Sequence, residues 1–190
     1  YISIRIKCQE AMSKFKKILI DKKRQFFLNI NYLPQVIILY EKFYKYLNDD
    51  YFLCKDKSFT DAVLNAIEHS EPYFWVITTE KDKFAGFVFL DNLVGTKGNL
   101  HSAEVTTCIL PEFWGKFTKI CAKKFIKYCF KKYNLKKIKA CIFPQNQRVR
   151  AILKQSGFKK EGLLRSETMR SGKLQDVEIF AVINGEKCNL

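Results

Sequence analysis

The stretch that decides the fold runs from Glu104 to Phe158 and reads EVTTCILPEFWGKFTKICAKKFIKYCFKKYNLKKIKACIFPQNQRVRAILKQSGF. Its first segment, Glu104–Leu110, is apolar and β-branched, which predicts a strand. A turn around Gly115 then leads into a long amphipathic helix. A second strand at Ile138–Phe143, a turn and a second helix complete the stretch. This order of strands and helices predicts a mixed α and β fold.

The helix predicted over Gly115–Tyr133 begins directly after a strand and a glycine-containing turn. The first backbone N–H groups of a helix have no partner inside it, and the macrodipole adds partial positive charge there. Such a helix start is a site for a phosphate-bearing ligand. The apolar stripe of this helix, which includes Phe117, Cys121 and Phe125, predicts packing against a sheet.

The 190 residues show two patterns, with no linker or internal repeat between them, and we expect one domain over 1–190. Residues 1–71 are predicted to be mainly helical, and residues 73–183 form the mixed core. The first part has a short strand at Ile2–Ile6 and three helices, Ala11–Leu28, Gln35–Leu47 and Ala62–His69. The core opens with strands at Tyr73–Thr79, Phe84–Leu90 and His101–Leu110, the last two joined by a longer turn at Asp91–Asn99.

The composition suits a globular protein with a hydrophobic core, because 47% of the residues are apolar and 28% are charged. No apolar run reaches the roughly 20 residues needed to span a bilayer, so no membrane contact is expected. The N-terminus lacks a secretory signal pattern, although the chain opens on Tyr1, which leaves a removed segment open. The oligomeric state is also left open.

The seven cysteines are odd in number and widely spaced, and only two histidines, His69 and His101, are present. A zinc site, another metal site or a disulfide framework is therefore not expected. Cys108 and Cys141 lie in apolar segments, which predicts small core residues. This cysteine usage predicts a reducing, cytoplasmic location.

The formal net charge is +15. One interpretation is an acidic or nucleic-acid partner. The other is compositional bias, since the residues favoured by AT-rich codons (Lys, Ile, Phe, Tyr and Asn) are abundant while Arg is scarce. In either case the positive field attracts polyanions, coenzyme A included.

Four pieces of this sequence, in order and at matching intervals, resemble the GNAT acyltransferase superfamily and, within it, the Rim-like enzymes that acetylate protein N-termini. The resemblance covers about Tyr73 to Val182, a little over half of the chain. The pieces are Ala103–Val105 with Ile109–Lys116; Tyr128–Leu135; Pro144–Asn146 with Ile152–Lys154 and Gly157-Phe158; and Glu161–Arg165 with Gly172 and Asp176-Val177.

The resemblance implies an α/β (α+β) fold: a mixed, mostly antiparallel sheet, flanked by helices, with one splayed pair of parallel strands. Here that pair would be Ser102–Leu110 and Ile138–Phe143. The pantetheine arm of acetyl-CoA, the co-substrate, would lie in the opening, with its pyrophosphate on N–H groups near Trp114–Thr118. The implied cofactor-binding residues are Ile109, Leu110, Trp114, Gly115, Lys116, Phe117, Thr118 and Asn146.

Glu104 is the candidate catalytic residue, because such enzymes often carry a glutamate base on the strand that lines the cleft. A partly buried carboxylate can have the raised pKa that a base needs. The alternative is an ordinary strand carboxylate paired with a lysine. Asn146 also has two interpretations, a contact to the pantetheine amides and a helix cap. Arg148 and Arg150 are expected to be solvated.

The sequence departs from the family pattern at the phosphate loop and at the second helix. Phe117 stands where the family usually has a second small residue, so its side chain either crowds the pyrophosphate or points into the core. Val149 replaces a serine placed near the thiolate leaving group, and Leu153 replaces the tyrosine acid of other branches. A proton donor would then come from water or from elsewhere, such as Tyr128.

The expected activity is an N-acetyltransferase that moves an acetyl group from acetyl-CoA to a primary amine by direct attack. The amine acceptor would be a small molecule or a protein N-terminus. Two alternatives stay open. One is a catalytically impaired GNAT-fold binding module, which the departures at Phe117 and Val149 motivate. The other is a basic nucleic-acid or ribosome-surface binder that uses the lysine-rich faces.

Overall fold

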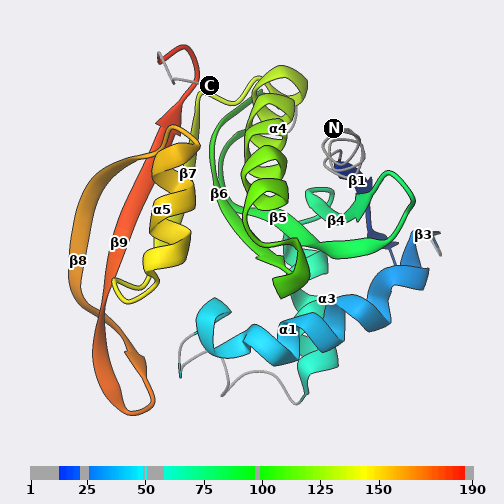
Figure 1. Cartoon of the computed structure of the whole chain (residues 1–190), viewed down its shortest axis with the longest axis horizontal. Helices are drawn as coiled ribbons and strands as arrows, with labels where there is room; N and C mark the ends of the chain where they lie inside the picture. The colour runs from blue at the N-terminus through cyan, green and yellow to red at the C-terminus, as the bar shows by residue number, and fades with distance from the viewer. Residues whose placement is uncertain (1–12, 22–25, 49, 51–57, 97–98, 187–190) are drawn as a thin grey trace, which may run out of the picture.

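A computed structural model describes residues 13–21, 26–48, 50, 58–96 and 99–186. The largest element is a seven-stranded sheet with the order β1-β4-β5-β6-β7-β9-β8 (Figure 1). Within it, β6 and β7 pair in parallel, and the other neighbours pair antiparallel. Its strands are β1 (Ser13–Lys17), β4 (Phe74–Thr79), β5 (Phe84–Thr96), β6 (Asn99–Ile109), β7 (Lys137–Ile142), β8 (Lys159–Arg170) and β9 (Lys173–Ile183).

Helices cover both faces of this sheet (Figure 1). Helices α4 (Lys116–Tyr133) and α5 (Gln147–Gln155) lie on one face, and α1 (Leu33–Leu47) and α3 (Phe59–His69) pack on the other. None of the helices in the described ranges is long and apolar enough to cross a bilayer. The short elements are β2 (Leu19–Asp21), β3 (Phe26–Leu28), and the 3-10 turns η2 (Ile30–Tyr32) and η3 (Pro111–Phe113).

Strand β4 shows why the sheet carries helices on both faces. Successive side chains of a strand point to opposite faces. Trp75 and Ile77 therefore pack with the α4 side, while Phe74 and Val76 pack with α1 and α3. All four side chains are at most 1% exposed. The first four residues of the strand are apolar, as burial on both faces requires.

Local sequence signals set several helix ends. Ser58 caps α3, because its hydroxyl accepts a hydrogen bond from the Asp61 N–H at 3.1 Å. Asn134 ends α4 in the left-handed region, at φ 51°. Pro34 stands in the first turn of α1, where its missing N–H needs no helical partner.

The helix predicted over Ala11–Leu28 is wrong wherever the structure describes it. That part of the chain forms β1, β2 and β3, and β1 pairs with β4, with Ser13 opposite Thr79. The ring centroid of Phe15 on β1 lies 5.2 Å from that of Phe125 on α4. A partner strand far along the chain thus decides the conformation of this segment, whereas α1 and α3 are helical as predicted. The strand predicted at Ile2–Ile6 lies outside the described residues.

The long turn predicted at Asp91–Asn99 is also wrong. Strand β5 continues to Thr96 and β6 begins at Asn99, so the two strands form a long hairpin. The polar residues that suggested a turn form an irregularity in the strand, where the pairing shifts between Asp91 and Val94. Asn92 adopts a positive φ of 44° there.

Candidate functional site

The site is built on the divergence of β6 and β7. Their parallel pairing covers Ser102–Glu104 against Lys137–Lys139 and then stops. Each strand continues beyond this point on its outer neighbour, with Ile109 of β6 opposite Gly86 and Ile142 of β7 opposite Glu178. The facing edges of β6 and β7 are therefore open past Glu104. The predicted splay of two parallel strands is confirmed.

A cleft of about 580 Å³ lies between the splay and the helices α4 and α5, and we call it the α4–α5 cleft. Val105, Thr107 and Ile109 of β6 form one part of its lining, and Thr118 and Cys121 of α4 form another. The lining is mainly apolar. The cleft reaches the opening between the two strands, where the family resemblance implies the pantetheine arm.

The N-terminus of α4 borders this cleft and has no side-chain cap. Gly115 precedes it with φ 98° and ψ −122°, a backbone conformation that glycine adopts readily. The first helical bond runs from the Lys119 N–H to the Gly115 oxygen at 3.1 Å, so the amides of Lys116, Phe117 and Thr118 precede the helical ladder. Apart from Gly115 and its two chain neighbours, no atom of the described residues lies within 4 Å of the place where a Gly115 Cβ would stand. The open space and uncapped amides fit a pyrophosphate group.

The side chain of Phe117 points into the core and away from this space. It is 9% exposed, and its ring centroid lies 5.0 Å from that of Phe113. Thr118 is buried too, and its hydroxyl donates to the Phe113 oxygen at 2.9 Å. The bulky residue at position 117 therefore leaves the helix start free for a ligand.

Trp114 connects three elements at the mouth of the α4–α5 cleft. Its indole N–H donates to the Ile109 oxygen at 2.8 Å. The guanidinium carbon of Arg148 lies 3.9 Å from a Trp114 ring centroid, and the Phe43 ring of α1 lies 6.0 Å away. Arg148 is exposed, but its guanidinium group stacks on the Trp114 ring.

Leu110 differs from the other predicted cofactor-binding residues. Its N–H donates to the backbone oxygen of Ala85, and its side chain packs on the α1 face of the sheet.

Asn146 stands between β7 and α5 and lines cavities on both sides of the sheet. Its Oδ1 accepts a hydrogen bond from the Val149 N–H at 3.3 Å, so it caps α5 as one of its two interpretations predicted. The capped position places Asn146 at the edge of the splay. A contact to a bound pantetheine stays a prediction.

A second cavity, of about 860 Å³, lies on the other face of the splay, and we call it the acidic cavity. Three carboxylates line it, those of Asp91, Glu104 and Glu167, and its described lining includes no Lys or Arg. The acidic cavity and the α4–α5 cleft meet at the splay. They share the residues Tyr46, Leu47, Val105, Thr107, Asn146, Val149 and Leu153.

Glu104 is held at the point where β6 leaves β7. Asn92 donates from Nδ2 to its Oε2 at 3.1 Å, and Asp91 stands directly opposite Glu104 on β5. The irregularity in β5 makes this arrangement possible, because bulges redirect side chains next to functional sites. Cys141 of β7 also lines the cavity, where partial desolvation of its thiol, and then the nearby Glu104, raises the pKa of the thiol to about 12. The residue as a whole is still exposed, which corrects its prediction as a core residue, whereas Cys108 is buried.

Asp91 is the most perturbed carboxyl of this site. Burial, and then the charge of Glu104, raises the pKa of Asp91 to about 6. Its Oδ1 is buried and has no hydrogen-bond partner among the described residues. The ionised form of Asp91 is therefore disfavoured in the folded protein.

Asp91→Asn is expected to stabilise the protein at neutral and alkaline pH. The folded pKa lies above the ordinary value of 3.8, so the stability associated with Asp91 is complete below that value and is lost as pH rises through about 6. A rise in pKa from 3.8 to about 6 corresponds to about 3 kcal/mol, which partial solvent access reduces to about 1–2 kcal/mol. Urea unfolding at about pH 8 should show this gain and at about pH 4 should not. An equal gain at both pH values would contradict the account.

Several features of the site were missed by sequence reasoning. Asp91 and Asn92 had been assigned to a turn. Arg150 is half-buried and ion-paired with Glu178, which corrects its prediction as a solvated residue. Tyr128 lies outside the lining of both cavities, in a ring cluster with Trp75 and Tyr133. The polar residues around Asp91 were the visible signal, but their meaning depends on the partner strand.

Comparison with known proteins identifies the family. The model of the acetyltransferase (GNAT) domain family matches residues 40–159. The chain is 30% identical over 122 residues to the uncharacterized N-acetyltransferase p20 of Bacillus licheniformis, covering 64% of this chain and 67% of that protein. It is 26% identical over 148 residues to the probable N-acetyltransferase YjcK of Bacillus subtilis (strain 168), covering 76% and 81%.

Solved structures show the same fold. The spermidine N-acetyltransferase from Vibrio cholerae in complex with CoA and spermine superposes with a TM-score of 0.68 at 21% identity, over 90% of this chain and 95% of that one. A point mutant of the spermidine N-acetyltransferase SpeG from the same organism gives a TM-score of 0.71 at 22% identity, over 93% and 96%. The chain belongs to the GNAT acetyltransferase family, and it is an acetyl-CoA-dependent N-acetyltransferase.

Proposed function

We propose that the α4–α5 cleft holds acetyl-CoA and that the acidic cavity holds the acceptor amine, so that the two substrates meet at the splay. Acetyl-CoA supplies the acetyl group as a thioester. The uncapped amides of Lys116, Phe117 and Thr118 would hold its pyrophosphate. The open edge of β6 past Glu104 would pair with the pantetheine amides, and the side-chain amide of Asn146 would face them from α5.

Glu104 acts as the base in this proposal. An acceptor amine is protonated near neutral pH, and it must lose a proton before its nitrogen can form a bond to carbon. Glu104 takes that proton in the acidic cavity, next to Val105 of the lining that the two cavities share, while Asn92 keeps the carboxylate oriented. The neutral nitrogen then forms the new C–N bond and the C–S bond breaks. The nitrogen gives up its second proton to water as the amide forms, and the departing thiolate accepts a proton from water to leave as the CoA thiol. A backbone N–H on the open edge of β6 would stabilise the charge that develops on the carbonyl oxygen.

The acceptor is inferred to be an amine that carries at least one further positive charge. The observation that carries this inference is the lining of the acidic cavity: three carboxylates and no Lys or Arg among its described residues, in a chain with a net charge of +15. Such a lining attracts cations and disfavours acidic acceptors. A polyamine fits this description, and spermine is present in the related complex from Vibrio cholerae.

The N-terminus of a protein is the second candidate acceptor, and the size of the acidic cavity favours it. At about 860 Å³ the cavity has room for more than one amine group. Its lining also includes Tyr46 and Asn48 near the end of α1, which would border the residues that follow the terminal amine. For a peptide, the carboxylates predict a preference for basic residues near the N-terminus.

An acceptor panel tests the proposal. It compares spermidine and spermine with a monoamine of similar length, and a peptide with Lys at its second position with one carrying Glu. We expect kcat/KM for acetyl-CoA-dependent CoA release to favour the acceptor with more positive charge by about tenfold or more, and increasingly so at low salt. Glu167→Gln should reduce this preference through the KM of the amine. The proposal would be contradicted if the monoamine reacted as fast as spermidine and spermine and the Glu peptide reacted as fast as the Lys peptide.

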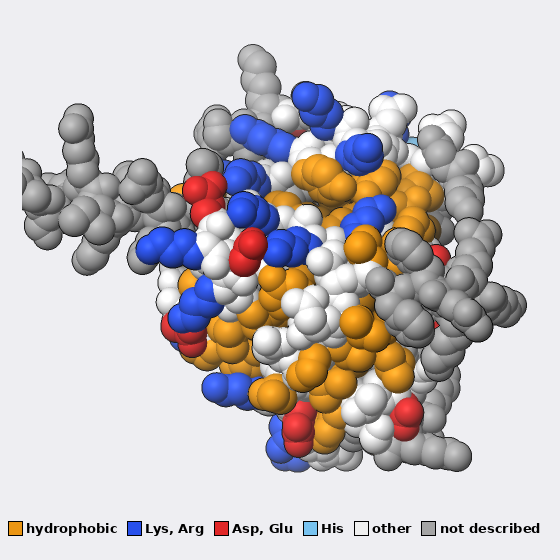
Figure 2. Space-filling view, turned by 90° about the vertical axis from the view of Figure 1, so that its right-hand side faces the viewer, with side chains coloured by type: hydrophobic (Ala, Val, Ile, Leu, Met, Phe, Trp, Pro, Cys, Tyr) orange, Lys and Arg blue, Asp and Glu red, His pale blue; other side chains and the backbone are white. Residues whose placement is uncertain are grey.

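A general nucleic-acid binder is a less well supported function. On the face drawn in Figure 2, Lys and Arg side chains are interspersed with acidic and hydrophobic ones. A nucleic-acid site gathers basic residues into one patch or stripe.

The cysteines bear on the cellular compartment of the protein. Cys108, Cys121 and Cys129 are free and buried, and burial raises the pKa of Cys108 and of Cys121 to about 12. We propose a reducing compartment such as the cytoplasm.

A further inference from the structure

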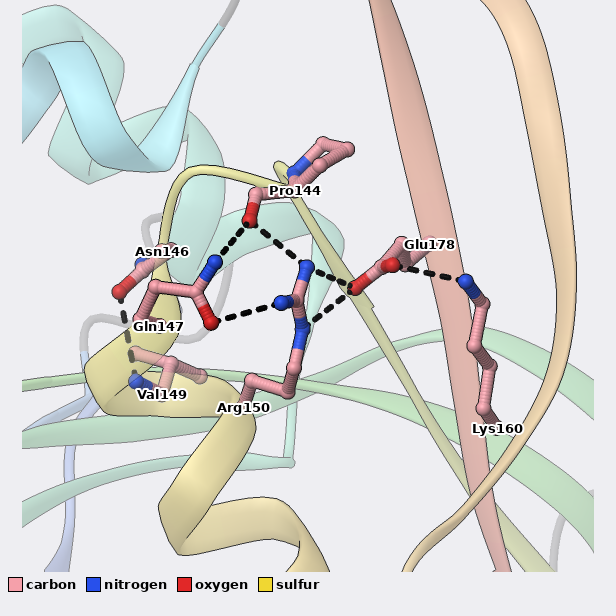
Figure 3. A network of polar contacts seen from close by, with 7 residues as sticks. All are labelled: Pro144, Asn146, Gln147, Val149, Arg150, Lys160 and Glu178. Carbon is pink, nitrogen blue, oxygen red and sulfur yellow. Dashed lines mark hydrogen bonds and ion pairs between the residues drawn. The ribbon is translucent and has the colours of Figure 1, made fainter.

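Arg150 of α5 binds three separate parts of the chain (Figure 3). Its Nε and Nη2 donate to Oε2 of Glu178 on β9 at 2.9 and 2.7 Å. Nη2 also donates to the backbone oxygen of Pro144 at 2.7 Å, and Nη1 donates to Oε1 of Gln147 at 2.7 Å. One guanidinium group thus joins β9, the turn that follows β7 and the first turn of α5.

Glu178 is the buried end of this network. Its side chain is 8% exposed, and its other oxygen accepts from Lys160 Nζ of β8 at 2.7 Å. Burial alone would raise the pKa of Glu178, but the hydrogen bonds from Lys160 and Arg150 outweigh it, and the pKa is lowered. The carboxylate therefore stays charged near neutral pH. A buried carboxylate with two cationic partners is a geometrically specific anchor.

The anchor sits where the sheet opens. Glu178 lies opposite Ile142, the last residue of β7, so it marks the end of the strand that leaves β6. Past Lys139 that strand has no partner on its β6 side within the described residues. The turn at Pro144 and the start of α5 are held instead from the β9 side, through Arg150. Asn146, which caps α5, stands inside this held segment.

We propose that the Arg150–Glu178 pair is a positioning device for acetyl transfer. It fixes the Pro144–Gln147 turn, and so sets the distance at which Asn146 and the start of α5 face the open edge of β6. That distance decides whether the thioester arm fits between the two strands. The inference rests on the placement of acetyl-CoA in the α4–α5 cleft proposed above. Both residues act through Asn146 and the backbone, and neither needs to touch the reacting atoms.

A purely structural ion pair is the competing interpretation. Breaking a buried pair destabilises a protein wherever it lies. The chain offers a control pair in the same sheet, because Lys137 of β7 and Glu161 of β8 form an ion pair of 2.6 Å at the closed end of the splay. Lys137 stands opposite Ser102, where β6 and β7 are still paired. That pair stabilises the sheet without touching the turn or α5.

The experiment compares Arg150→Lys and Glu178→Gln with Glu161→Gln. Arg150→Lys keeps the charge but cannot reach the carboxylate, Pro144 and Gln147 together. For each variant, calorimetry gives the Kd of acetyl-CoA, steady-state assays give kcat and both KM values, and thermal unfolding gives Tm. At a temperature well below the Tm of each variant, we expect Arg150→Lys and Glu178→Gln to raise the Kd and the KM for acetyl-CoA about tenfold. The KM of the amine should change much less. Glu161→Gln should leave Kd unchanged.

The double variant with both network changes should lose no more acetyl-CoA affinity than the worse single variant, because the two residues form one unit. Variants that lower Tm but keep the wild-type Kd for acetyl-CoA would overturn the positioning role. An equal rise in Kd for Glu161→Gln would overturn it as well. A wild-type protein that binds no acetyl-CoA would contradict the proposed function as well as this inference. A wild-type protein that binds acetyl-CoA, with network variants of unchanged Kd, would contradict this inference alone.

Discussion

Glu104→Gln is expected to lower kcat for acetyl transfer by about 10²–10⁴-fold, the range that a positioned general base contributes. Gln is close to Glu in shape and can keep the hydrogen bond from Asn92, but it cannot take a proton from the acceptor ammonium. The Kd of acetyl-CoA should change little, because Glu104 lines the acidic cavity and not the α4–α5 cleft. Steady-state kinetics with saturating amine, and calorimetry with acetyl-CoA, check the two halves of this result.

Glu167→Gln is the matched control, since it removes another carboxylate from the same cavity. It should raise the KM of a cationic amine and leave kcat nearly unchanged. A Glu104→Gln enzyme that keeps kcat within about threefold of the wild type would show that the proton leaves by another route. Asp91, the neighbouring carboxyl on β5, would then be the next group to replace.

Gly115→Val is expected to weaken acetyl-CoA binding by about 10–100-fold. The backbone at Gly115 has φ 98°, where a β-branched side chain is strained by about 1–3 kcal/mol. The loop relieves this strain by rotating, and the rotation moves the amides of Lys116, Phe117 and Thr118 away from the phosphate position. Each 1.4 kcal/mol of lost interaction corresponds to about a tenfold change in Kd. Calorimetric titration with acetyl-CoA at about 150 mM salt measures it, with ATP as a control for general charge attraction.

Gly185→Val provides a comparison at another glycine of positive φ away from the site. Gly185 has φ 88°, and no atom lies within 4 Å of the place where its Cβ would stand, as at Gly115. It follows the end of β9 and lines neither cavity. Gly185→Val should lower stability while leaving the Kd of acetyl-CoA unchanged. If both variants weakened binding equally, the start of α4 would not be the phosphate site.

Local chemistry made the helices of the core predictable. The three- and four-residue spacing of Val36, Leu39 and Phe43 indicated α1, and the stripe through Phe117 and Phe125 indicated α4. Both helices appear in the structure with nearly the predicted bounds. The splay and the placement of Glu104 on the cleft strand came from the family resemblance, and the observed pairing of β6 with β7 agrees with the predicted splay.

The features that sequence reasoning missed depend on distant partners. Strand β1 looked helical because its lysines and Phe15 also fit a helical period, and only β4 decides between the two patterns. The polar run after Leu90 looked like a turn, although its pairing with β6 makes it a bulged strand that brings Asn92 to Glu104. Arg150 and Glu178 stand 28 positions apart, and no spacing rule connects them.

The most direct test of the account is a crystal structure of the protein with CoA and spermine. We predict that the pantetheine arm lies between β6 and β7, that the pyrophosphate meets the amides at the start of α4, and that an amine nitrogen lies in the acidic cavity within hydrogen-bond reach of Glu104. CoA bound away from the splay, or spermine bound outside the acidic cavity with Glu104 facing solvent, would contradict it.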